Sequence, residues 1–467
     1  MKKTKIVCTI GPASSDLDTM KKMIRAGMNV ARFNMSHGTH ESHLKMINTL
    51  KQAREELGAP VAIMIDLKGP EIRIKQFEEG KVVLKRGQKF VLTSQDIVGH
   101  IDGVSVTYKK FPAVVDVGTR VLLNDGFIEL KVIDKNKDSV LTEVVVGGVL
   151  SNNKSINLPG IDLDMPFLSD ADKLDLEFAK YVDADIVSLS FVSKKQDVLD
   201  AKRFLNHIGA SDVLVVSKIE NNFGIENIEE ILAVSDGIMV ARGDMGVEID
   251  YERIPAIQKR IISLCKENGK LSITATQMLE SMINSPRPTR AEISDVANAC
   301  IDGSSCVMLS GETSAGTYPV ESVRAMSKII EESEKNFIHK WQEHFVNKNN
   351  VSASIGYAAC NLASSLDVNS ILVVTKSGLA AESISRFRPR QIILACTPNL
   401  KTYYKMAACW GVIPLLDKEY TNTAVLLDSA KDKAVSTRIV KKDELFVEVA
   451  GVNPGESGIN FVRVEKY

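Results

Sequence analysis

Eight short apolar runs, separated by turns and helical patterns, most constrain the fold of this 467-residue chain. The runs cover residues 4–11, 29–35, 61–67, 186–191, 213–219, 237–242, 271–278 and 305–311. Segments between them carry apolar residues at helical spacing, for example at 41–57 and 290–301. Eight alternating strand and helix units predict an α/β fold of the (β/α)8 TIM barrel type. An open sheet is disfavoured because no G-x-G-x-x-G or Walker A motif is present.

One interval breaks this rhythm, because residues 68–185 separate the third run from the fourth. Much of that interval alternates apolar and polar residues between turns of Gly, Asn and Asp, which predicts a small antiparallel, β-barrel-like domain. A domain inserted in a βα loop must stand at the carboxyl end of the barrel. It is therefore a candidate lid over an active site.

A third unit follows the barrel. Residues 346–354 are interpreted as a linker, and five later strand patterns alternate with helical patterns, which predicts a C-terminal α/β domain. The predicted division is 1–68 for the first part of the barrel, 69–166 for the inserted β-rich domain, 167–345 for the second part of the barrel and 346–467 for the C-terminal domain.

Composition restricts the partners and the compartment. Lys plus Arg number 58 against 59 Asp plus Glu, so no global charge favours nucleic acid or an anionic membrane. Seven scattered cysteines without a C-x-x-C motif predict buried, reduced thiols. Gly11-Pro12 interrupts the N-terminal apolar run, and no run approaches membrane-spanning length. We therefore expect a cytoplasmic protein.

Charged residues stand where the fifth apolar run ends, in the sequence VLVVSKIE. Lys218 and Glu220 are two residues apart on an extended backbone, so their side chains leave the same face of the strand. An isolated pair of this kind is most often a salt bridge. Polar residues also follow five other runs, and this convergence at one end of a barrel favours a functional site.

The polar residues at the other strand ends are Arg32, Asn34, Ser36, Asp66, Gly243, Asp244, Thr276 and Glu312. Glu220 and Asp244, with no histidine or cysteine nearby, predict a hard divalent cation such as Mg²⁺ or Mn²⁺. Arg32, Arg73 and Lys218 supply positive charge, which predicts an anionic substrate such as a phosphate. Oxygen atoms of Asn34, Ser36 and Asp66 could hold a second, monovalent cation.

Three histidines have the spacing of a metal cluster. His37, His40 and His43 recur every three residues at the start of a predicted helix. Imidazoles in such a place are usually surface residues, and this is the interpretation we adopt.

Nine stretches of the sequence together resemble one enzyme family. They are KTKIVCTIGP, GMNVARFNMSHG, IDLKGPEIR, NKSINLPG, SKIEN, SDGIMVARGDMGVEI, ITATQMLESM, PRPTRAE and VMLSGETSAGTYP. On these motifs the chain resembles the pyruvate kinases of the bacterial type over essentially all of its length. The resemblance implies a phosphotransferase of glycolysis that converts phosphoenolpyruvate and ADP into pyruvate and ATP. It also implies a barrel A domain, a B domain that closes as a lid, and a C-terminal regulatory domain.

The resemblance also implies roles for the residues at the barrel mouth. Lys218 would stabilise the phosphoryl group in flight, and Arg32 would bind the substrate phosphate. Glu220 and Asp244 would bind Mg²⁺ or Mn²⁺. Gly243, Asp244 and Thr276 would contact the substrate, with Thr276 near the face where the enolate is protonated. Lys218, Arg32 and Thr276 are thus the implied catalytic residues.

Nucleotide and potassium sites are implied in the same way. The implied nucleotide contacts are Asn34, Ser36, His37, Arg73 and Lys154. The implied K⁺ ligands are Asn34, Ser36, Asp66 and Leu67, the last through its main-chain carbonyl. Glu71 resembles the acidic residue of the potassium-dependent branch.

In the C-terminal domain, Thr375, Lys376, Ser377 and Gly378 end a strand and open a helix, as a phosphate cradle does. The residues that follow and the later segment GESGINF depart from the effector loop of relatives controlled by fructose 1,6-bisphosphate. Control by a sugar monophosphate, or only weak regulation, is expected equally with control by fructose 1,6-bisphosphate. A homotetramer is implied, and because the sequence ends at Tyr467 we expect no further C-terminal domain of the phosphohistidine type.

Two other functions compete with this one. A different metal-dependent barrel enzyme acting on an enolate would use Glu220 and Asp244, but it would not explain the inserted domain or Lys218. A non-catalytic sensor of sugar phosphates would be expected to have lost Lys218, Glu220 or Asp244, and all three are present. The pyruvate kinase hypothesis is therefore preferred.

Overall fold

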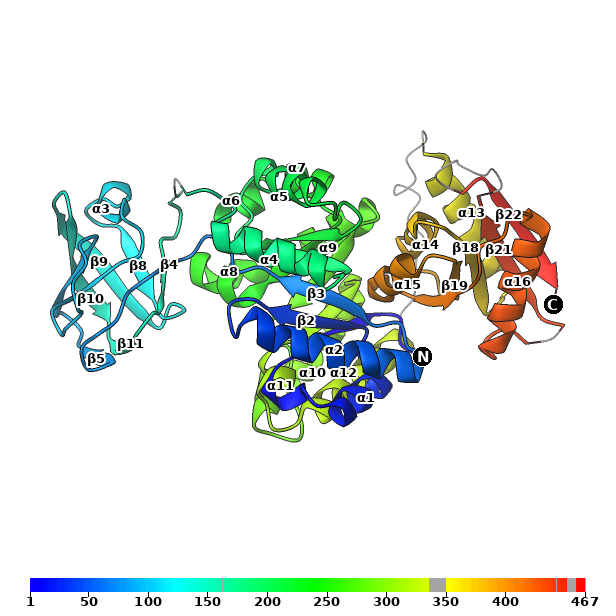
Figure 1. The fold of residues 1–467 in the computed structure, drawn as a ribbon, viewed down its shortest axis with the longest axis horizontal. Helices are drawn as coiled ribbons and strands as arrows, with labels where there is room; N and C mark the ends of the chain where they lie inside the picture. The colour runs from blue at the N-terminus through cyan, green and yellow to red at the C-terminus, as the bar shows by residue number, and fades with distance from the viewer. Residues whose placement is uncertain (162, 164, 336–349, 442, 452–458, 467) are drawn as a thin grey trace.

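The computed structural model describes residues 1–161, 163, 165–335, 350–441, 443–451 and 459–466. Three units lie in a row (Figure 1): the inserted β unit at one end, the barrel in the centre and the C-terminal unit at the other end. The inserted and C-terminal units therefore flank opposite sides of the barrel.

Eight parallel strands close the central unit into a barrel in the order β1-β17-β16-β15-β14-β13-β3-β2. Their bounds are β1 (Lys5–Thr9), β2 (Val30–Asn34), β3 (Ala62–Asp66), β13 (Ile186–Leu189), β14 (Leu214–Ile219), β15 (Gly237–Ala241), β16 (Leu271–Ala275) and β17 (Cys306–Leu309). Each strand lies within one of the eight apolar runs, so the TIM barrel prediction is confirmed. Val7, Met64, Val216 and Ile273 fill the interior, which is a packed core and not a pore.

Helices surround the barrel and cover a second, larger apolar layer. They are α1 (Leu17–Ala26), α2 (His40–Leu57), α4 (Asp170–Tyr181), α5 (Lys195–His207), α6 (Asn222–Glu226), α7 (Ile228–Val234), α8 (Arg242–Glu248), α9 (Ile254–Glu267), α10 (Arg290–Asp302), α11 (Gly311–Ser314) and α12 (Pro319–Lys335). Side-chain caps set several of their starts: Asp16, Thr39, Ser169 and Thr289 each accept a hydrogen bond from a backbone amide of the first turn.

The inserted unit is a seven-stranded sheet, ordered β4-β12-β8-β9-β10-β6-β7, with a separate pair of strands, β11 and β5. Its elements are β4 (Ile72–Arg73), β5 (Lys81–Leu84), β6 (Lys89–Thr93), β7 (Gly103–Ser105), α3 (Phe111–Val114), β8 (Arg120–Leu123), β9 (Ile128–Lys135), β10 (Ser139–Val146), β11 (Gly148–Ser151) and β12 (Ser155–Asn157). The prediction of an antiparallel domain is wrong for one pair, since β6 and β7 are parallel. The chain at 94–102 forms a crossover there instead of a hairpin turn.

The C-terminal unit is a five-stranded sheet in the order β20-β19-β18-β21-β22, parallel except for its last pair. Its strands are β18 (Ser370–Val374), β19 (Ile392–Thr397), β20 (Val412–Leu416), β21 (Leu445–Ala450) and β22 (Phe461–Lys466), and its helices are α13 (Val351–Ser365), α14 (Leu379–Ser385), α15 (Leu400–Lys405) and α16 (Thr423–Ser436). The predicted C-terminal α/β unit is confirmed.

The linker predicted at residues 346–354 is wrong in its second half, which belongs to helix α13. The side chain of Asn350 accepts a hydrogen bond from the amide of Ala353 at 3.0 Å and caps the helix earlier than the polar composition suggested. Residues 346–349 lie outside the described part of the chain.

All seven cysteines are buried and free, as expected. Within the described residues, no helix has the length and hydrophobicity needed to cross a lipid bilayer.

A carboxylate of the last barrel helix fixes the start of the first strand. Glu334 accepts hydrogen bonds from the amides of Lys3 and Thr4, both at 2.7 Å, and from the Thr4 hydroxyl at 2.8 Å. Thr4 is fully buried, so its amide could not find water if this acceptor were removed. The contact therefore secures the seam at which β1 meets β17.

We predict that Glu334→Ala lowers the free energy of unfolding by about 1 to 3 kcal/mol, because a buried amide loses its acceptor. Urea titration followed by circular dichroism measures the change. Glu331 is the control, since it lies on the same helix and only approaches the N-terminal amine at 3.8 Å in an exposed ion pair. Glu331→Ala should change stability by less than about 0.5 kcal/mol. Equal effects of the two substitutions would refute the assigned role.

Candidate active site

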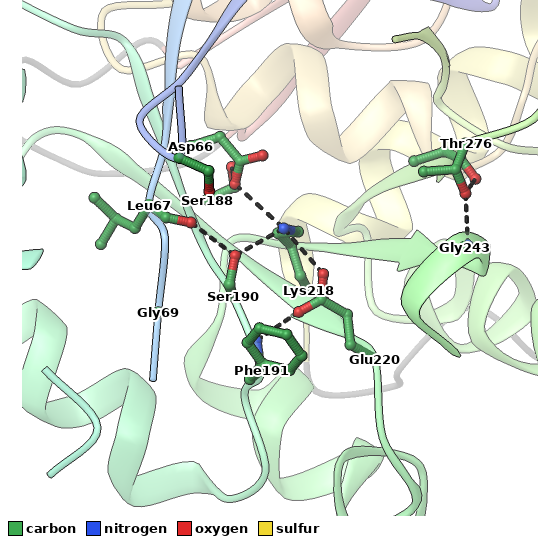
Figure 2. Close-up of polar contacts among 12 residues, drawn as sticks. Asp66, Leu67, Gly69, Ser188, Ser190, Phe191, Lys218, Glu220, Gly243 and Thr276 are labelled. Carbon is green, nitrogen blue, oxygen red and sulfur yellow. Dashed lines mark hydrogen bonds and ion pairs between the residues drawn. The ribbon is translucent and has the colours of Figure 1, made fainter. Parts of the chain in front are cut away.

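Lys218, near the end of β14, is the centre of a buried polar cluster at the barrel mouth (Figure 2). Its Nζ lies 2.7 Å from Ser190 Oγ, 2.9 Å from Glu220 Oε1 and 3.6 Å from Asp66 Oδ1. These partners come from the ends of three adjacent strands, β3, β13 and β14. The prediction that Lys218 and Glu220 lie on one face agrees with this ion pair.

The electrostatic balance keeps Lys218 charged. Burial alone would lower the pKa of Lys218, but Asp66, Glu220 and Asp244 outweigh it, and the pKa is raised. Burial would likewise raise the pKa of Asp66, yet Lys218 and Arg32 outweigh that effect and the pKa is lowered. At neutral pH the cluster therefore contains a lysine cation beside an aspartate anion.

Asp66 is fully buried and also orients Arg32. Arg32 Nε donates to Asp66 Oδ2 at 2.7 Å, and Arg32 Nη1 donates to Thr9 Oγ1 at 2.9 Å. Ser188 Oγ donates to the other carboxylate oxygen, Oδ1, at 2.6 Å. One aspartate thus fixes the two cations that the sequence placed at the second and fifth strand ends.

Glu220 and Asp244 fit the predicted divalent cation. Glu220 is fully buried, and its Oε2 accepts from the amide of Phe191 at 2.6 Å. Its Oε1 is ion-paired with Lys218 but has no hydrogen bond among the described residues. Burial raises the pKa of Glu220, and bound positive charge would oppose that effect.

Asp244, in the first turn of α8, is half-buried, and its side chain makes no hydrogen bond or ion pair with another described residue. No cluster of three or more His, Cys, Asp or Glu suited to a metal occurs in the described part of the chain. A cation held by Glu220 and Asp244 would therefore complete its shell with water or substrate oxygens, as Mg²⁺ does.

Thr276 and Gly243 form a second polar contact, across the view from Lys218 in Figure 2. Gly243 N donates to Thr276 Oγ1 at 2.7 Å, and that hydroxyl is 2.6 Å from the carbonyl of Ala275. Thr276 has a φ of +65°, which is rare for a β-branched residue. Arg242 holds this turn by donating to the Thr276 carbonyl at 2.7 Å, and it is anchored in turn by Asp295 at 2.8 Å.

The predicted K⁺ ligands lie on adjacent strand ends. Asn34 and Asp66 are register partners of β2 and β3. Asn34 Oδ1 accepts from the amide of Ser36 at 3.1 Å, and the Leu67 carbonyl accepts from Ser190 Oγ at 2.7 Å. This set consists of oxygen donors, the type that a hard monovalent cation accepts.

Family models and known relatives agree with this architecture. The model of the pyruvate kinase barrel domain matches residues 1–323, and that of the pyruvate kinase alpha/beta domain matches residues 353–465. The chain belongs to the pyruvate kinase family. It is therefore an enzyme of the phosphotransferase class.

Individual relatives cover nearly the whole chain. Pyruvate kinase of Geobacillus stearothermophilus is 43% identical over an alignment of 469 positions, which covers 99% of this chain and 80% of that protein. Pyruvate kinase of Clostridium acetobutylicum is 42% identical over 470 residues, covering 100% of this chain and 99% of that protein. A crystal structure of a pyruvate kinase from Cryptosporidium parvum superposes with a TM-score of 0.94 at 36% identity, covering 100% of this chain and 96% of that one.

The nucleotide residues implied by the pyruvate kinase resemblance lie partly outside the Lys218 cluster. Arg73, on β4 of the inserted unit, donates to the carbonyl of Asn153 at 2.7 Å and pairs with Glu71 at 2.7 Å. Lys154, on the same unit, has no side-chain partner among the described residues. His37 is exposed in the loop before α2.

The surface interpretation of the three histidines is wrong for His43, which is buried. Its Nε2 lies 2.7 Å from the carbonyl of His37, and its ring packs edge-on against Phe33 because α2 lies against the barrel. His40 is exposed in part, but its Nε2 lies 2.6 Å from Asp175 and its ring stacks on Phe178. Both side chains thus have structural partners.

The candidate effector loop lies in the C-terminal unit, remote from the barrel mouth. Gly378 has a φ of +94°, and its amide donates to Thr375 Oγ1 at 3.0 Å. Lys376 pairs with Glu419 at 2.7 Å, and Ser377 is exposed. Of the segment GESGINF, residues 455–458 lie outside the described part of the chain.

Ser188 and Ser190 were missed by the sequence reasoning, although the run IVSLSF contained a signal. Two serines two residues apart in an apolar strand leave the same face, as Lys218 and Glu220 do. The amide of Phe191, which bonds Glu220, had no such signal, because it depends on a φ of +58°. Glu312, by contrast, has a structural role, because its carboxylate accepts hydrogen bonds from the amide of Ser310 nearby and from the amide of Leu279, which follows the neighbouring strand β16.

A cleft of about 120 Å³ lies beside the cluster, between the inserted unit and the barrel. Glu71, Ile156 and Asn157 line it from the insert, and Asn221 and Glu248 line it from the barrel. The hydrogen bond from Asn157 Nδ2 to Glu248 Oε1 crosses the two units at 3.0 Å. The insert therefore already touches α8, the helix that carries Asp244.

We predict that Ser190→Ala reduces kcat about tenfold with a smaller change in KM for the phosphorylated substrate, because the Lys218 ammonium loses one of its anchors. Steady-state kinetics measures both constants. Ser217 is the matched control, since the hydroxyl of this buried serine of β14 bonds only Ser235 among the described residues, at 2.7 Å, away from the site. Ser217→Ala should retain wild-type kcat, and a wild-type kcat for Ser190→Ala would remove Ser190 from the site.

Proposed function

We propose that the barrel site of this chain transfers the phosphoryl group of phosphoenolpyruvate to ADP, giving pyruvate and ATP in glycolysis. The observation that carries the proposal is the buried Lys218 ammonium, held between Asp66 and Glu220 at the mouth of a pyruvate kinase barrel. Phosphoryl transfer depends mainly on positioning and on neutralising the charge of the group in flight. A fixed cation in a site of low dielectric meets both needs.

Lys218 and Arg32 bind and neutralise the phosphoryl group in this proposal. Each is fixed by Asp66, so little reorganisation is needed when the charge on the phosphoryl oxygens shifts. Gly243 and Asp244 contact the rest of the substrate. Thr276 lies at the face where the enolate carbon gains its proton.

Two cation sites belong to the proposal. Glu220 and Asp244 would hold Mg²⁺ or Mn²⁺, which when bound supplies positive charge to the oxygens of the substrate. Asn34, Ser36, Asp66 and the Leu67 carbonyl would hold K⁺. The protein's own part is to hold these oxygen donors in place at the strand ends.

Both units would bind the nucleotide. Asn34, Ser36 and His37 would contact it from the barrel, and Arg73 and Lys154 would contact it from the insert. Residues 69–166 would close over it as a lid.

Residues 346–467 would form a regulatory domain, with a sugar phosphate as effector at Thr375, Lys376, Ser377 and Gly378. We further propose a cytoplasmic homotetramer, on the strength of family membership.

The decisive test is Lys218→Met, assayed for pyruvate formation from phosphoenolpyruvate, ADP and Mg²⁺. We expect kcat to fall at least about 10³-fold while phosphoenolpyruvate binding changes little, because the charge is needed most in the transition state. Lys202→Met is the control, since Lys202 pairs with Asp236 away from the barrel mouth, at 3.0 Å. Substantial turnover by Lys218→Met would exclude the assigned role.

The potassium site has its own test. Glu71→Lys places a tethered ammonium where the acidic residue now stands, and we expect it to reduce the K⁺ dependence of kcat. Activity is titrated with KCl at constant ionic strength, using tetramethylammonium chloride as the balancing salt. A KCl requirement equal to that of the wild type would contradict the assignment of Glu71 to the cation site. Glu78→Lys, in the same unit, is the charge-matched control.

A further inference from the structure

One carboxylate contacts both chain connections between the barrel and the inserted unit. Residues 67–71 lead out of β3, and the return connection ends at Ser169, the cap of α4. Asp172 Oδ1 accepts from the amide of Gly69 at 2.9 Å, and Oδ2 accepts from the amide and hydroxyl of Ser169 at 3.0 and 2.6 Å. Asp172 is only 1% exposed, so these bonds are shielded from water.

Helix capping explains only half of this arrangement. Ser169 and Asp172 form a capping box, the reciprocal pair that satisfies free amides at the start of a helix. The bond to Gly69 joins residues 103 positions apart in the chain and serves no need of α4. Asp172 is therefore a tie between the outgoing and returning connections.

The outgoing connection also packs closely against Ser190, a member of the Lys218 cluster. Gly69 has a φ of +74°, and a Cβ placed on it would lie 2.8 Å from Ser190 Cβ and 3.0 Å from the Ser190 carbonyl oxygen. Ser190 in turn is the residue whose hydroxyl lies 2.7 Å from Lys218 Nζ. Figure 2 shows Gly69 just beyond Leu67, on the side where Ser190 bonds the Leu67 carbonyl. No space for a side chain remains between this connection and the residue that anchors Lys218.

We propose that Asp172 is a positioning residue for phosphoryl transfer. By holding both connections, it fixes the inserted unit relative to the barrel. Through the close contact of Gly69 with Ser190, it also keeps the Lys218 ammonium where the reaction requires it. The inference rests on the proposed function and adds that the placement of the insert and the placement of Lys218 are coupled.

The next barrel helix supplies a matched control. Asp197 occupies the same position in α5, is 4% exposed, and accepts from the amides of Ser193 and Lys194 at 2.9 and 3.0 Å. Asp197 borders the cleft between the insert and the barrel, but its hydrogen bonds stay within the start of its own helix. Asp197 and Asp172 thus cap alike, but only Asp172 reaches a connection to the insert.

The experiment compares Asp172→Ala with Asp197→Ala in the full chain. Both lose a buried cap, so both unfolding midpoints should fall, and that of Asp172→Ala should fall further because the Gly69 amide also loses its acceptor. We expect Asp172→Ala alone to lower kcat about tenfold or more and to raise KM for ADP several-fold. Asp197→Ala should stay within about twofold of wild type in both constants. Asp172→Asn should recover part of the loss, because its amide oxygen still accepts one of the two connections.

Hydrogen exchange gives a readout independent of activity. The Gly69 amide is protected by Asp172, so its exchange should be faster in Asp172→Ala and unchanged in Asp197→Ala. Equal kinetic losses in the two alanine variants, or unchanged Gly69 exchange, would overturn the inference.

Two further variants cover the case in which Asp172→Ala does not fold. Gly69→Ala keeps the Asp172 carboxylate but pushes on Ser190, and it should lower kcat. Wild-type kcat in both Gly69→Ala and Asp172→Asn would also overturn the inference. If the wild-type protein formed no pyruvate, the proposed function would be refuted instead. The exchange of the Gly69 amide hydrogen would still show whether Asp172 holds the outgoing connection.

Discussion

A buried ammonium group needs fixed negative charge around it, and the site at the barrel mouth is built on this need. Lys218 is 9% exposed, and removing its charge from water would be costly without Asp66 and Glu220. The same two carboxylates then determine their surroundings. Asp66 fixes Arg32, and Glu220 Oε1 pairs with Lys218 but accepts no hydrogen bond among the described residues. The carboxylates that stabilise Lys218 therefore have second roles: Asp66 orients the Arg32 guanidinium, and Glu220 offers an oxygen ligand for a metal ion.

The sequence predicted those parts of the fold and of the site that arise from a regular spacing of residues along the chain. Apolar runs marked all eight barrel strands, and spacing by two placed Lys218 and Glu220 on one face. Contacts between single residues far apart in the chain leave no periodic signal. The hydrogen bond from the Gly69 amide to Asp172 and the contact of Gly69 with Ser190 are of this kind. They become visible only when the barrel closes and brings the strand ends together.

Two errors have the same origin. The insert was predicted to be antiparallel, but β6 and β7 are parallel, because the path of residues 94–102 depends on contacts elsewhere in the insert, such as the hydrogen bond from the amide of Gly99 to the carbonyl of Gln76. His43 reads as a surface residue, but α2 lies against the barrel and buries it. In both cases local composition gave the wrong answer because tertiary packing decided the outcome.

The ion pair of Arg73 with Glu71 bears on how the insert would act as a lid. Arg73 is satisfied by Glu71 and by the Asn153 carbonyl, so an incoming phosphate must compete with both partners for its guanidinium. Lys154, which has no such partner among the described residues, carries no comparable cost. In the proposed function, the first nucleotide contact from the insert would therefore form more readily through Lys154, and the Arg73 contact would require closure to separate Arg73 from Glu71. Because residues 67–71 contain Glu71 as well as Gly69, a movement that exchanges the partners of Arg73 also acts on the segment packed against Ser190. The proposed nucleotide contact of Arg73 and the placement of Lys218 in the barrel would then depend on the same short segment, residues 67–71.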